Sequence, residues 1–485
     1  MHKALRTFKS LKLKVVALSV ASCLGLSSIA TNAYADSYDD IMIPQIGTAG
    51  VRGISVPKEM ALGDFFMRSA RAYLPVLDDP VLNEYVTTLG NKLLSHADNV
   101  NFPFNFFVVK DSTLNASAFL GGKVAIHTGL FKYAQTEDEF ASVIAHEISH
   151  VTQRHIARFV ESMVVANQLS MAGLIGAVVM SIVNPAIGMA AVSTTMGAQL
   201  QSRINFTRDN EYEADRIGIA LLYKAGMNPY GAVDMFKRLL SQQGNINPVF
   251  TLLIDHPLSE IRVAEAQTRA SQYPSRKNST NPDYDMAQAR ILVRYEGLST
   301  KADYEQLLEV LKQNPDKKSS VYINYALAYL DKLPSTLNHS LFVLDLKTDI
   351  DLKRGHATAA IDRLLGQYRI MPNNQVVVVN LASAYNETAQ FDKAIKVLNN
   401  YLNKKPNDVL ALSLLEYAQT KTRDKCAAMQ TRGEIYALSA AYQQSISLYS
   451  QALRECSDML TRERIKARVS QISVQRAFDE SLINK

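Results

Sequence analysis

The spacing of apolar residues predicts helices near the start of the chain, followed by a small sheet. Residues 60–96 carry apolar side chains at helical spacing. Residues 104–109 and 123–128 are short apolar runs typical of strands, and residues 112–117 between them are typical of a turn. Two strands joined this closely predict a small antiparallel sheet. The helical pattern resumes at Glu137.

Further helical patterns cover residues 208–225 and 229–240, and a polar stretch follows at residues 274–282. That stretch is rich in Ser, Asn, Arg and Lys and is typical of a linker. A chain of 485 residues is too long for one ordinary core, so two or three domains are expected. Apolar and charged contents of 47% and 20% are typical of a globular protein.

After about residue 283 the pattern changes to helical hairpins with an internal repeat. Ala360 and Pro372 lie 34 residues before Ala394 and Pro406, and 34 residues is the period of tetratricopeptide repeats. An ordinary helical bundle is the alternative, but the same 34-residue spacing at both the Ala pair and the Pro pair argues against it. Stacked hairpins form a concave surface suited to peptides or partner proteins. Weaker copies of the pattern cover residues 304–315 and 433–449.

The N-terminus has the order of a secretory signal peptide. Five basic residues precede an apolar run over residues 15–30. Ala33-Tyr34-Ala35 then provides a small-x-small cleavage site. This order predicts cleavage after Ala35 and export from the cytoplasm. A lipoprotein leader is the alternative, because Val20-Ala21-Ser22-Cys23 resembles a lipobox, although the apolar run continues past Cys23.

Removal of the leader changes the charge and leaves two cysteines. Loss of five Lys and Arg lowers the formal net charge from +6 to +1, so no basic surface typical of nucleic-acid binding remains. Cys426 and Cys456 form an even pair that an oxidising compartment favours as one disulfide bond. Two buried thiols are the alternative.

Residues 162–202 contain no charged side chain. A membrane span is one interpretation. Asn184-Pro185 interrupts the run, which favours helices that are buried or that cover the active site. Contact with a membrane surface or a hydrophobic client is a third interpretation.

The segment His146-Glu147-Ile148-Ser149-His150 is the strongest candidate for chemistry. On a helix, His146 and His150 are separated by about 40° around the axis and about 6 Å along it, so both imidazoles can reach one ion. Glu147 can then act as the general base of a zinc peptidase, which predicts one Zn²⁺ per chain. Two polar residues on a solvated helix face are the alternative. The apolar neighbours Phe140 and Ile144 argue against it.

The third zinc ligand is less clearly marked. His155 follows His150 by five residues, which is roughly 140° around a continuing helix, so we expect it on the helix surface. Glu211 and Asp215 share a helix face, where one carboxylate can bind zinc and the other can orient a ligating histidine. On spacing alone, Glu211 and Glu213 are equally good candidates.

His-Glu-x-x-His followed by Glu-x-x-x-Asp resembles the gluzincin family that holds the CAAX prenyl proteases, the HtpX-type heat-shock proteases and the Oma-type mitochondrial proteases. Residues 115–130 also resemble the stretch ahead of that family's metal helix. The leader and the repeats narrow the resemblance to periplasmic, tetratricopeptide-bearing members. The implied fold is mainly α: a zincin-like metallopeptidase domain with a small β-sheet, followed by an α-helical tetratricopeptide-repeat solenoid. The expected parts are a signal peptide (1–35), the metallopeptidase domain (36–275) and the repeat domain (283–485).

The resemblance also implies roles for individual residues. It makes His146, His150 and Glu211 the zinc ligands, Glu147 the general base and Asp215 the carboxylate that orients a ligand. This places Glu211 ahead of Glu213. The family's His-Pro followed by Arg is matched by His256, Pro257 and Arg262. A loop histidine there can stabilise an oxyanion or fill the open zinc position and hold the enzyme idle.

The expected function is a periplasmic zinc metalloendopeptidase, also chaperone-like, in the assembly and quality control of outer-membrane proteins. The resemblance implies unfolded or misassembled outer-membrane proteins as clients and the outer-membrane assembly machinery as partner through the repeats. Residues 123–128 are expected to be an edge strand that pairs with an extended substrate. The alternative is a scaffold or chaperone, or a lipoprotein-anchored protein, whose zinc site is rarely active.

Overall fold

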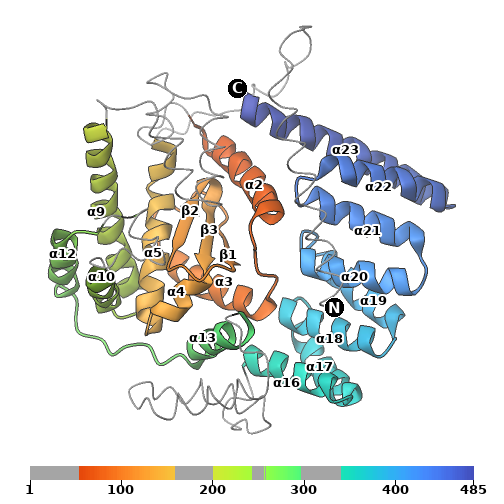
Figure 1. The fold of residues 1–485 in the computed structure, drawn as a ribbon, viewed down its shortest axis with the longest axis horizontal. Coiled ribbons are helices and arrows are strands. Elements are labelled where there is room, and N and C mark those ends of the chain that lie inside the picture. Colours follow the sequence, from red (N-terminus) through yellow and green to blue (C-terminus); the bar gives the residue numbers. More distant parts are fainter. Residues whose placement is uncertain (1–53, 159–199, 243–255, 257, 296–339, 485) are drawn as a thin grey trace. The chain divides into compact units, whose positions relative to one another are not determined.

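The computed structural model describes residues 54–158, 200–242, 256, 258–295 and 340–484 (Figure 1). The predicted leader, the repeat copy at 304–315 and nearly all of the uncharged stretch at 162–202 lie outside the described residues. Among the described helices, none is both long enough and apolar enough to cross a membrane.

Two helices make up the helical region predicted at residues 60–96. They are α2 (Val56–Tyr73) and α3 (Pro80–Leu94). Each has a proline in its first turn and a capping side chain before it, and both features favour a helix start. Ser55 caps α2, and Asp79 caps α3 by accepting the N–H groups of Val81 and Leu82.

The sheet has three strands, β1 (Asn105–Val109), β2 (Ala116–Phe119) and β3 (Lys123–His127), in the order β1-β3-β2. Both predicted strands are present. The prediction that they pair antiparallel is wrong, because β1 and β3 are parallel. The prediction that residues 123–128 form an edge strand is also wrong, since β3 lies in the centre.

The reason for both errors is β2, which falls partly in the segment expected to be a turn. β2 pairs antiparallel with β3, so the hairpin is β2–β3 and β1 joins on the other side of β3. Gly121 and Gly122 supply the left-handed turn between β2 and β3, with φ of 67° and 74°. The β2 sequence Ala-Ser-Ala-Phe has no β-branched residue, so its composition did not indicate a strand.

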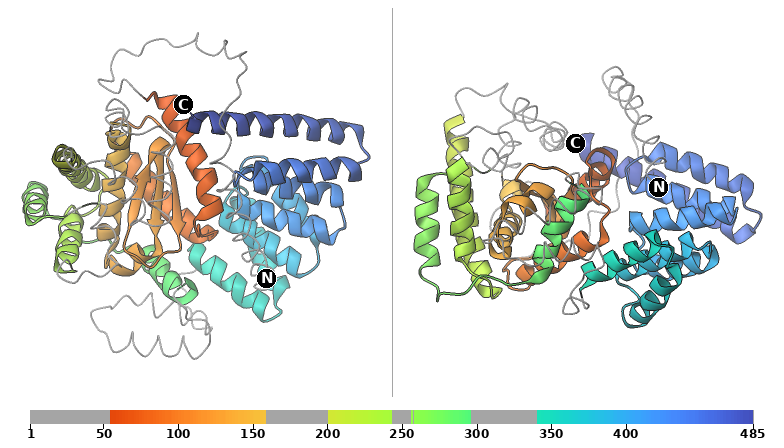
Figure 2. Two further views of the ribbon diagram at one scale, coloured as in Figure 1. Left: turned by 45° about the horizontal axis from the view of Figure 1, so that its top comes forward. Right: turned by 60° about the horizontal axis from the view of Figure 1, so that its bottom comes forward.

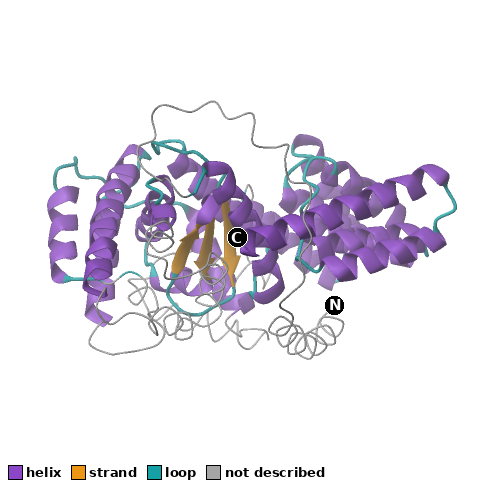
Figure 3. Ribbon diagram, turned by 90° about the horizontal axis from the view of Figure 1, so that it is seen from above, coloured by secondary structure: helices purple, strands orange, loops and turns teal. Residues whose placement is uncertain are grey.

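Helices cover both faces of this sheet (Figure 3). Alternate strand residues point to opposite faces. Phe106 and Val108 of β1 pack in the main core with α3 and with α5 (Glu137–Thr152). Phe107 and Val109 pack in a second cluster with Phe66 and its neighbours on α2. This double burial explains why β1 is apolar at four consecutive positions.

The layer beyond α5 consists of α9 (Leu200–Lys224), α10 (Tyr230–Gln242) and α12 (Glu260–Ala270). α9 approaches α5 closely at Gly218, where an added Cβ would lie 3.2 Å from the backbone nitrogen of His146. This contact fixes the rotation of α9 against α5. It therefore decides which carboxylates of α9 face the two histidines.

Residues 274–281 form neither helix nor strand, in line with their linker-like composition. The next helix, α13 (Pro282–Tyr295), packs into the same core as α3 and as α4 (Thr128–Tyr133). The Tyr284 hydroxyl donates to the Ala134 carbonyl at 2.8 Å, and the Gln288 amide donates to the Phe131 carbonyl at 2.7 Å. α13 thus belongs structurally with the helices around the sheet.

The remaining described residues form helical hairpins that stack in succession (Figure 2). Ala360 and Ala394, spaced by the predicted period, are both fully buried at equivalent places in two of these helices. The repeat prediction is therefore confirmed. The helices are α16 (Leu341–Lys353), α17 (Ala357–Ile370), α18 (Gln375–Glu387), α19 (Phe391–Leu402), α20 (Val409–Lys421), α21 (Lys425–Ala437), α22 (Tyr442–Glu455) and α23 (Met459–Asn484).

The favoured disulfide is present between Cys426, on α21, and Cys456, at the end of α22. It ties two neighbouring helices across a sequence separation of 30 residues. We expect the mature chain, purified from an oxidising compartment, to show no reactive thiol in denaturant before reduction and two after it. Two reactive thiols in the unreduced protein would contradict the bond.

Candidate metal centre

Helix α5 carries the His-Glu-x-x-His segment and is buried along its whole length. Thr136 caps it by accepting the N–H of Glu139 at 3.2 Å, and three acidic residues occupy the first turn. Negative charge near a helix N-terminus is stabilising because it opposes the helix dipole. These features stabilise the start of α5. Its C-terminal half, which holds His146 and His150, packs between the sheet and α9.

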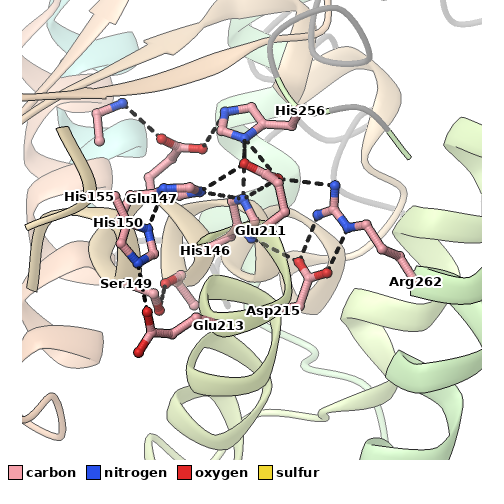
Figure 4. A network of polar contacts seen from close by, with 12 residues as sticks. His146, Glu147, Ser149, His150, His155, Glu211, Glu213, Asp215, His256 and Arg262 are labelled. Carbon is pink, nitrogen blue, oxygen red and sulfur yellow. Dashed lines mark hydrogen bonds and ion pairs between the residues drawn. The ribbon is translucent and has the colours of Figure 1, made fainter. Parts of the chain in front are cut away.

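His146, His150, Glu211 and His256 converge from three parts of the chain (Figure 4). The Nε2 atoms of His146 and His150 are 2.9 Å apart. The two carboxylate oxygens of Glu211 lie 3.4 Å from these nitrogens, one from each. Nδ1 of His256 lies 3.0 Å from Glu211 Oε1, and one donor atom from each of the four residues lies within 4.8 Å of all the others.

This donor set fits a divalent metal ion. Imidazole nitrogens and a carboxylate oxygen are borderline ligands of the kind that zinc takes. With bonds of roughly 2.0–2.1 Å, the donors of a tetrahedral site lie about 3.3 Å apart. The separations of 2.9–3.4 Å among His146, His150 and Glu211 match that spacing.

Glu147 lies beside this cluster and is only 1% exposed. Its Oε2 accepts the backbone N–H of Ala118, on strand β2, at 2.8 Å. Its Oε1 has no hydrogen-bond partner among the described residues and lies 3.4 Å from Nε2 of His256. Burial raises the pKa of Glu147, and a raised pKa suits a carboxylate that must exchange protons near neutral pH.

Asp215 and Arg262 stand behind His146. Asp215 Oδ1 lies 3.0 Å from His146 Nδ1, and the Arg262 guanidinium binds both oxygens of Asp215 at 2.7 and 2.8 Å. Arg262 also reaches Glu211, with Nη1 3.0 Å from Oε2. Burial alone would raise the pKa of Asp215, but its bonds with His146 and Arg262 outweigh burial and lower it. Asp215 therefore stays charged and can orient the imidazole of His146.

The two histidines of α5 have different electrostatic surroundings. Burial lowers the pKa of His150 to about 3 and keeps the ring neutral, which is the form that binds a metal. Burial also acts on His146, but Asp215 and Glu211 outweigh it and raise the pKa of His146 to about 10, so a metal ion that binds this ring would release a proton from it. The neighbouring carboxylate Asp215 thus distinguishes one histidine from the other.

His155 is not on the helix surface, and that prediction is wrong. The residue is 3% exposed. Its Nδ1 lies 2.9 Å from Nδ1 of His150, and its Nε2 lies 3.0 Å from Glu213 Oε2. The prediction assumed a continuing helix, whereas α5 ends at Thr152 and the backbone turns at Arg154, whose φ is 56°.

The structure places the other candidate residues as follows. Glu211 faces His146 and His150, and its rival Glu213 points to His155 on the other side. Asp215, His256 and Arg262 all lie within the network of Figure 4. The N–H group of Ala118 was not anticipated, because a backbone donor leaves no mark in a sequence.

Comparison with known proteins shows the family to which this chain belongs. The pattern of peptidase family M48 matches residues 80–270, which include every residue of the cluster. The β-barrel assembly-enhancing protease of Escherichia coli K12 is 35% identical over 478 residues, covering 96% of this chain and 97% of that protein. The chain belongs to peptidase family M48. It is accordingly a metalloprotease, and the family implies a divalent metal ion.

Other matches agree with this assignment. The β-barrel assembly-enhancing protease of Yersinia pestis is 36% identical over 445 residues, covering 89% of this chain and 91% of that protein. A mitochondrial metalloendopeptidase, OMA1 of Schizosaccharomyces pombe, is 25% identical over 190 residues, which is 38% of this chain and 51% of that protein. A tetratricopeptide-repeat pattern matches residues 351–417, in the stacked hairpins of this metalloprotease.

Proposed function

We propose that this metalloprotease is a periplasmic zinc endopeptidase that degrades misassembled outer-membrane proteins. The observation that carries the proposal is the buried Glu147 carboxylate beside two histidines and Glu211 at metal-ligand spacing. The names of the relatives from Escherichia coli and Yersinia pestis support a role in β-barrel assembly. The leader predicted to end at Ala35 supports export.

In this proposal His146, His150 and Glu211 hold the zinc ion, which polarises a carbonyl group and acidifies water when bound. Glu147 takes a proton from the attacking water at Oε1, the oxygen without a hydrogen-bond partner among the described residues. The Ala118 N–H holds the other oxygen in place, so the carboxylate is oriented before the substrate arrives. Asp215 fixes the ring of His146 from behind.

The edge strand β2 is the part of the sheet best placed to bind substrate. Ala118 of β2 contacts Glu147 directly, whereas β3 is paired on both sides. An extended client segment can add to a sheet edge through backbone hydrogen bonds, which ignore side-chain identity. We therefore propose β2 in place of the residues 123–128 expected from the sequence. This mode suits a protease whose clients share misfolding and no common sequence.

His256 guards the resting site in this proposal. Its Nδ1 lies with the metal-ligand donors, 3.4 Å from His146 Nε2, and its Nε2 lies 3.4 Å from Glu147 Oε1. The side chain thus occupies the space between the ligands and the base, where the water and the scissile carbonyl must enter. The geometry favours a fourth ligand at rest over an oxyanion donor.

Replacing His256 with Ala is expected to speed hydrolysis of a short unstructured peptide several-fold, because the position that the imidazole fills becomes open. Initial rates at saturating zinc measure the effect, with the zinc content of both proteins determined in parallel. A fall in rate of about 10²–10³-fold with full zinc content would instead identify His256 as an oxyanion donor.

The repeats recruit partners in this proposal. Their hairpins provide the stacked helical surface that binds peptides or proteins, and we assign to them the outer-membrane assembly machinery and unfolded clients. A chaperone-like role follows if a client is held without being cut.

Incubation of the mature chain with an unfolded outer-membrane β-barrel protein tests the proposal. We expect fragments that a strong chelator prevents and that added zinc restores. A folded β-barrel of the same sequence serves as the matched control and is expected to resist cleavage. Cleavage that persists in the chelator, or none at any zinc concentration, would overturn the proposed function.

A further inference from the structure

His155 is buried and pairs with the half-buried Glu213, on the side of His150 that faces away from the metal-ligand cluster (Figure 4). The rings of His150 and His155 are 4.8 Å apart and meet edge to face, at 81°. Nδ1 of one ring lies 2.9 Å from Nδ1 of the other. Neither His155 nor Glu213 belongs to the group of residues that could hold the metal ion.

The backbone at the end of α5 brings His155 to this place. Arg154 adopts a left-handed backbone conformation, which is unfavourable for residues other than Gly, Asn or Asp. Its guanidinium donates to Glu59 Oε1 at 2.7 Å and to the Ile54 carbonyl at 2.6 Å. These bonds to the start of α2 hold the turn, and the turn directs His155 back beneath His150.

The positions of the protons follow from the contacts. If Nε2 of His150 binds a metal ion, Nδ1 of that ring carries the proton. The N–H group then donates to His155, so Nδ1 of His155 is an acceptor and its proton lies on Nε2. That proton faces Glu213 Oε2 at 3.0 Å, and a carboxylate can only accept. Each ring N–H group in the series His150–His155–Glu213 thus meets an acceptor.

We propose that His155 is a positioning residue that holds His150 in the Nδ1–H tautomer and in the rotamer that directs Nε2 to the metal, with Glu213 fixing His155 in turn. The inference rests on the proposed zinc site. It gives His150 an orienting partner, as Asp215 is for His146. The two ligands of α5 therefore have different partners. His146 contacts the Asp215 carboxylate directly, whereas His150 reaches the Glu213 carboxylate through the imidazole of His155.

The outer member of this hydrogen-bonded series, Glu213, reaches the surface. Glu213 is partly exposed, at 31%, and its Oε2 also accepts from Nη2 of Arg158 at 3.1 Å. Arg158 and His155 share this one carboxylate oxygen, which keeps the carboxylate directed inward. A change at Glu213 is therefore expected to reach His150 only through His155.

Zinc affinity, measured by competition with a chromophoric chelator, tests the inference. His155→Leu removes the acceptor for His150 and is expected to weaken zinc binding about 10–100-fold. His155→Asn places an amide oxygen near the position of Nδ1 and is expected to recover most of that loss. Glu213→Ala is expected to cause a smaller loss, and Asp209→Ala, an exposed carboxylate on the same helix, none.

The visible absorption spectrum of the Co²⁺-substituted protein gives a second measure that does not depend on activity. We expect His155→Leu to shift the Co²⁺ bands and His155→Asn to restore them, because ligand orientation sets the geometry at the ion. If wild type and His155→Leu bind zinc equally and share one spectrum, the inference is wrong and the zinc site stands. If wild type binds no zinc, the proposed function fails first. Should His155→Leu not fold, Glu213→Ala decides, and a zinc affinity and Co²⁺ spectrum equal to those of wild type in that variant would overturn the inference.

Discussion

Replacing Glu147 with Gln is expected to lower the rate of peptide hydrolysis by about 10²–10⁴-fold, the usual contribution of a general base. Gln has nearly the same shape and keeps an oxygen that can accept the Ala118 N–H. It has no carboxylate that could take a proton from water. Because Glu147 is not among the possible metal ligands, zinc content should be unchanged. Initial rates at saturating zinc measure the effect.

A matched control separates this effect from a general loss of charge. Glu260, an exposed carboxylate in the first turn of α12, can be changed to Gln in the same way. That variant is expected to hydrolyse the peptide at the wild-type rate. A Glu147→Gln variant that is as active as this control would remove Glu147 from the chemistry, whatever its metal content.

Replacing Arg290 with Met is expected to reduce the free energy of unfolding by about 3–5 kcal/mol, as when one partner of a buried ion pair is removed. Arg290 is 1% exposed, and its guanidinium binds Asp79 and Asp345 at 2.7 Å each. Asp79 caps α3 and Asp345 lies on α16, so one side chain joins the helices around the sheet to the first of the described helices in the stacked hairpins. Met fills similar space but leaves two buried carboxylates without this cation. Urea unfolding measures the change.

Arg294, one turn further along α13, provides the control. It lies 3.6 Å from the same Asp345 and also pairs with Asp349, but its side chain is 32% exposed, so water already solvates it. Arg294→Met is expected to cost about 1 kcal/mol or less, as exposed ion pairs usually do. Equal losses in the two variants would mean that burial does not set the strength of this contact.

The sequence predicted the parts of the site that depend on local spacing. His146, Glu147 and His150 lie on one helix turn, and a helix of any sequence brings such positions together. The choice between Glu211 and Glu213 is different, because both lie on α9 and either could face α5. The close approach of α9 at Gly218 decides it, and this contact exists only after the helices pack.

The errors have a common physical cause in contacts between distant parts of the chain. Helix α5 ends without a Gly or Pro to mark its end, because Glu59 holds the turn at Arg154 from 95 residues away. Strand β2 is formed by small residues whose pairing with β3 and burial stabilise what their own propensity does not. At the end of α5 and in β2 the local sequence has only a weak structural preference, so contacts with distant residues determine the backbone conformation.

The metal content of the purified mature chain tests the central claim most directly. Elemental analysis should find one zinc per chain in wild type and in Glu147→Gln, and close to none in His146→Ala, His150→Ala and Glu211→Ala, since each of these loses a ligand. Far-UV circular dichroism on the same samples establishes that the ligand variants are folded. A folded Glu211→Ala variant with a full complement of zinc, or an active wild-type protein without zinc, would contradict the account.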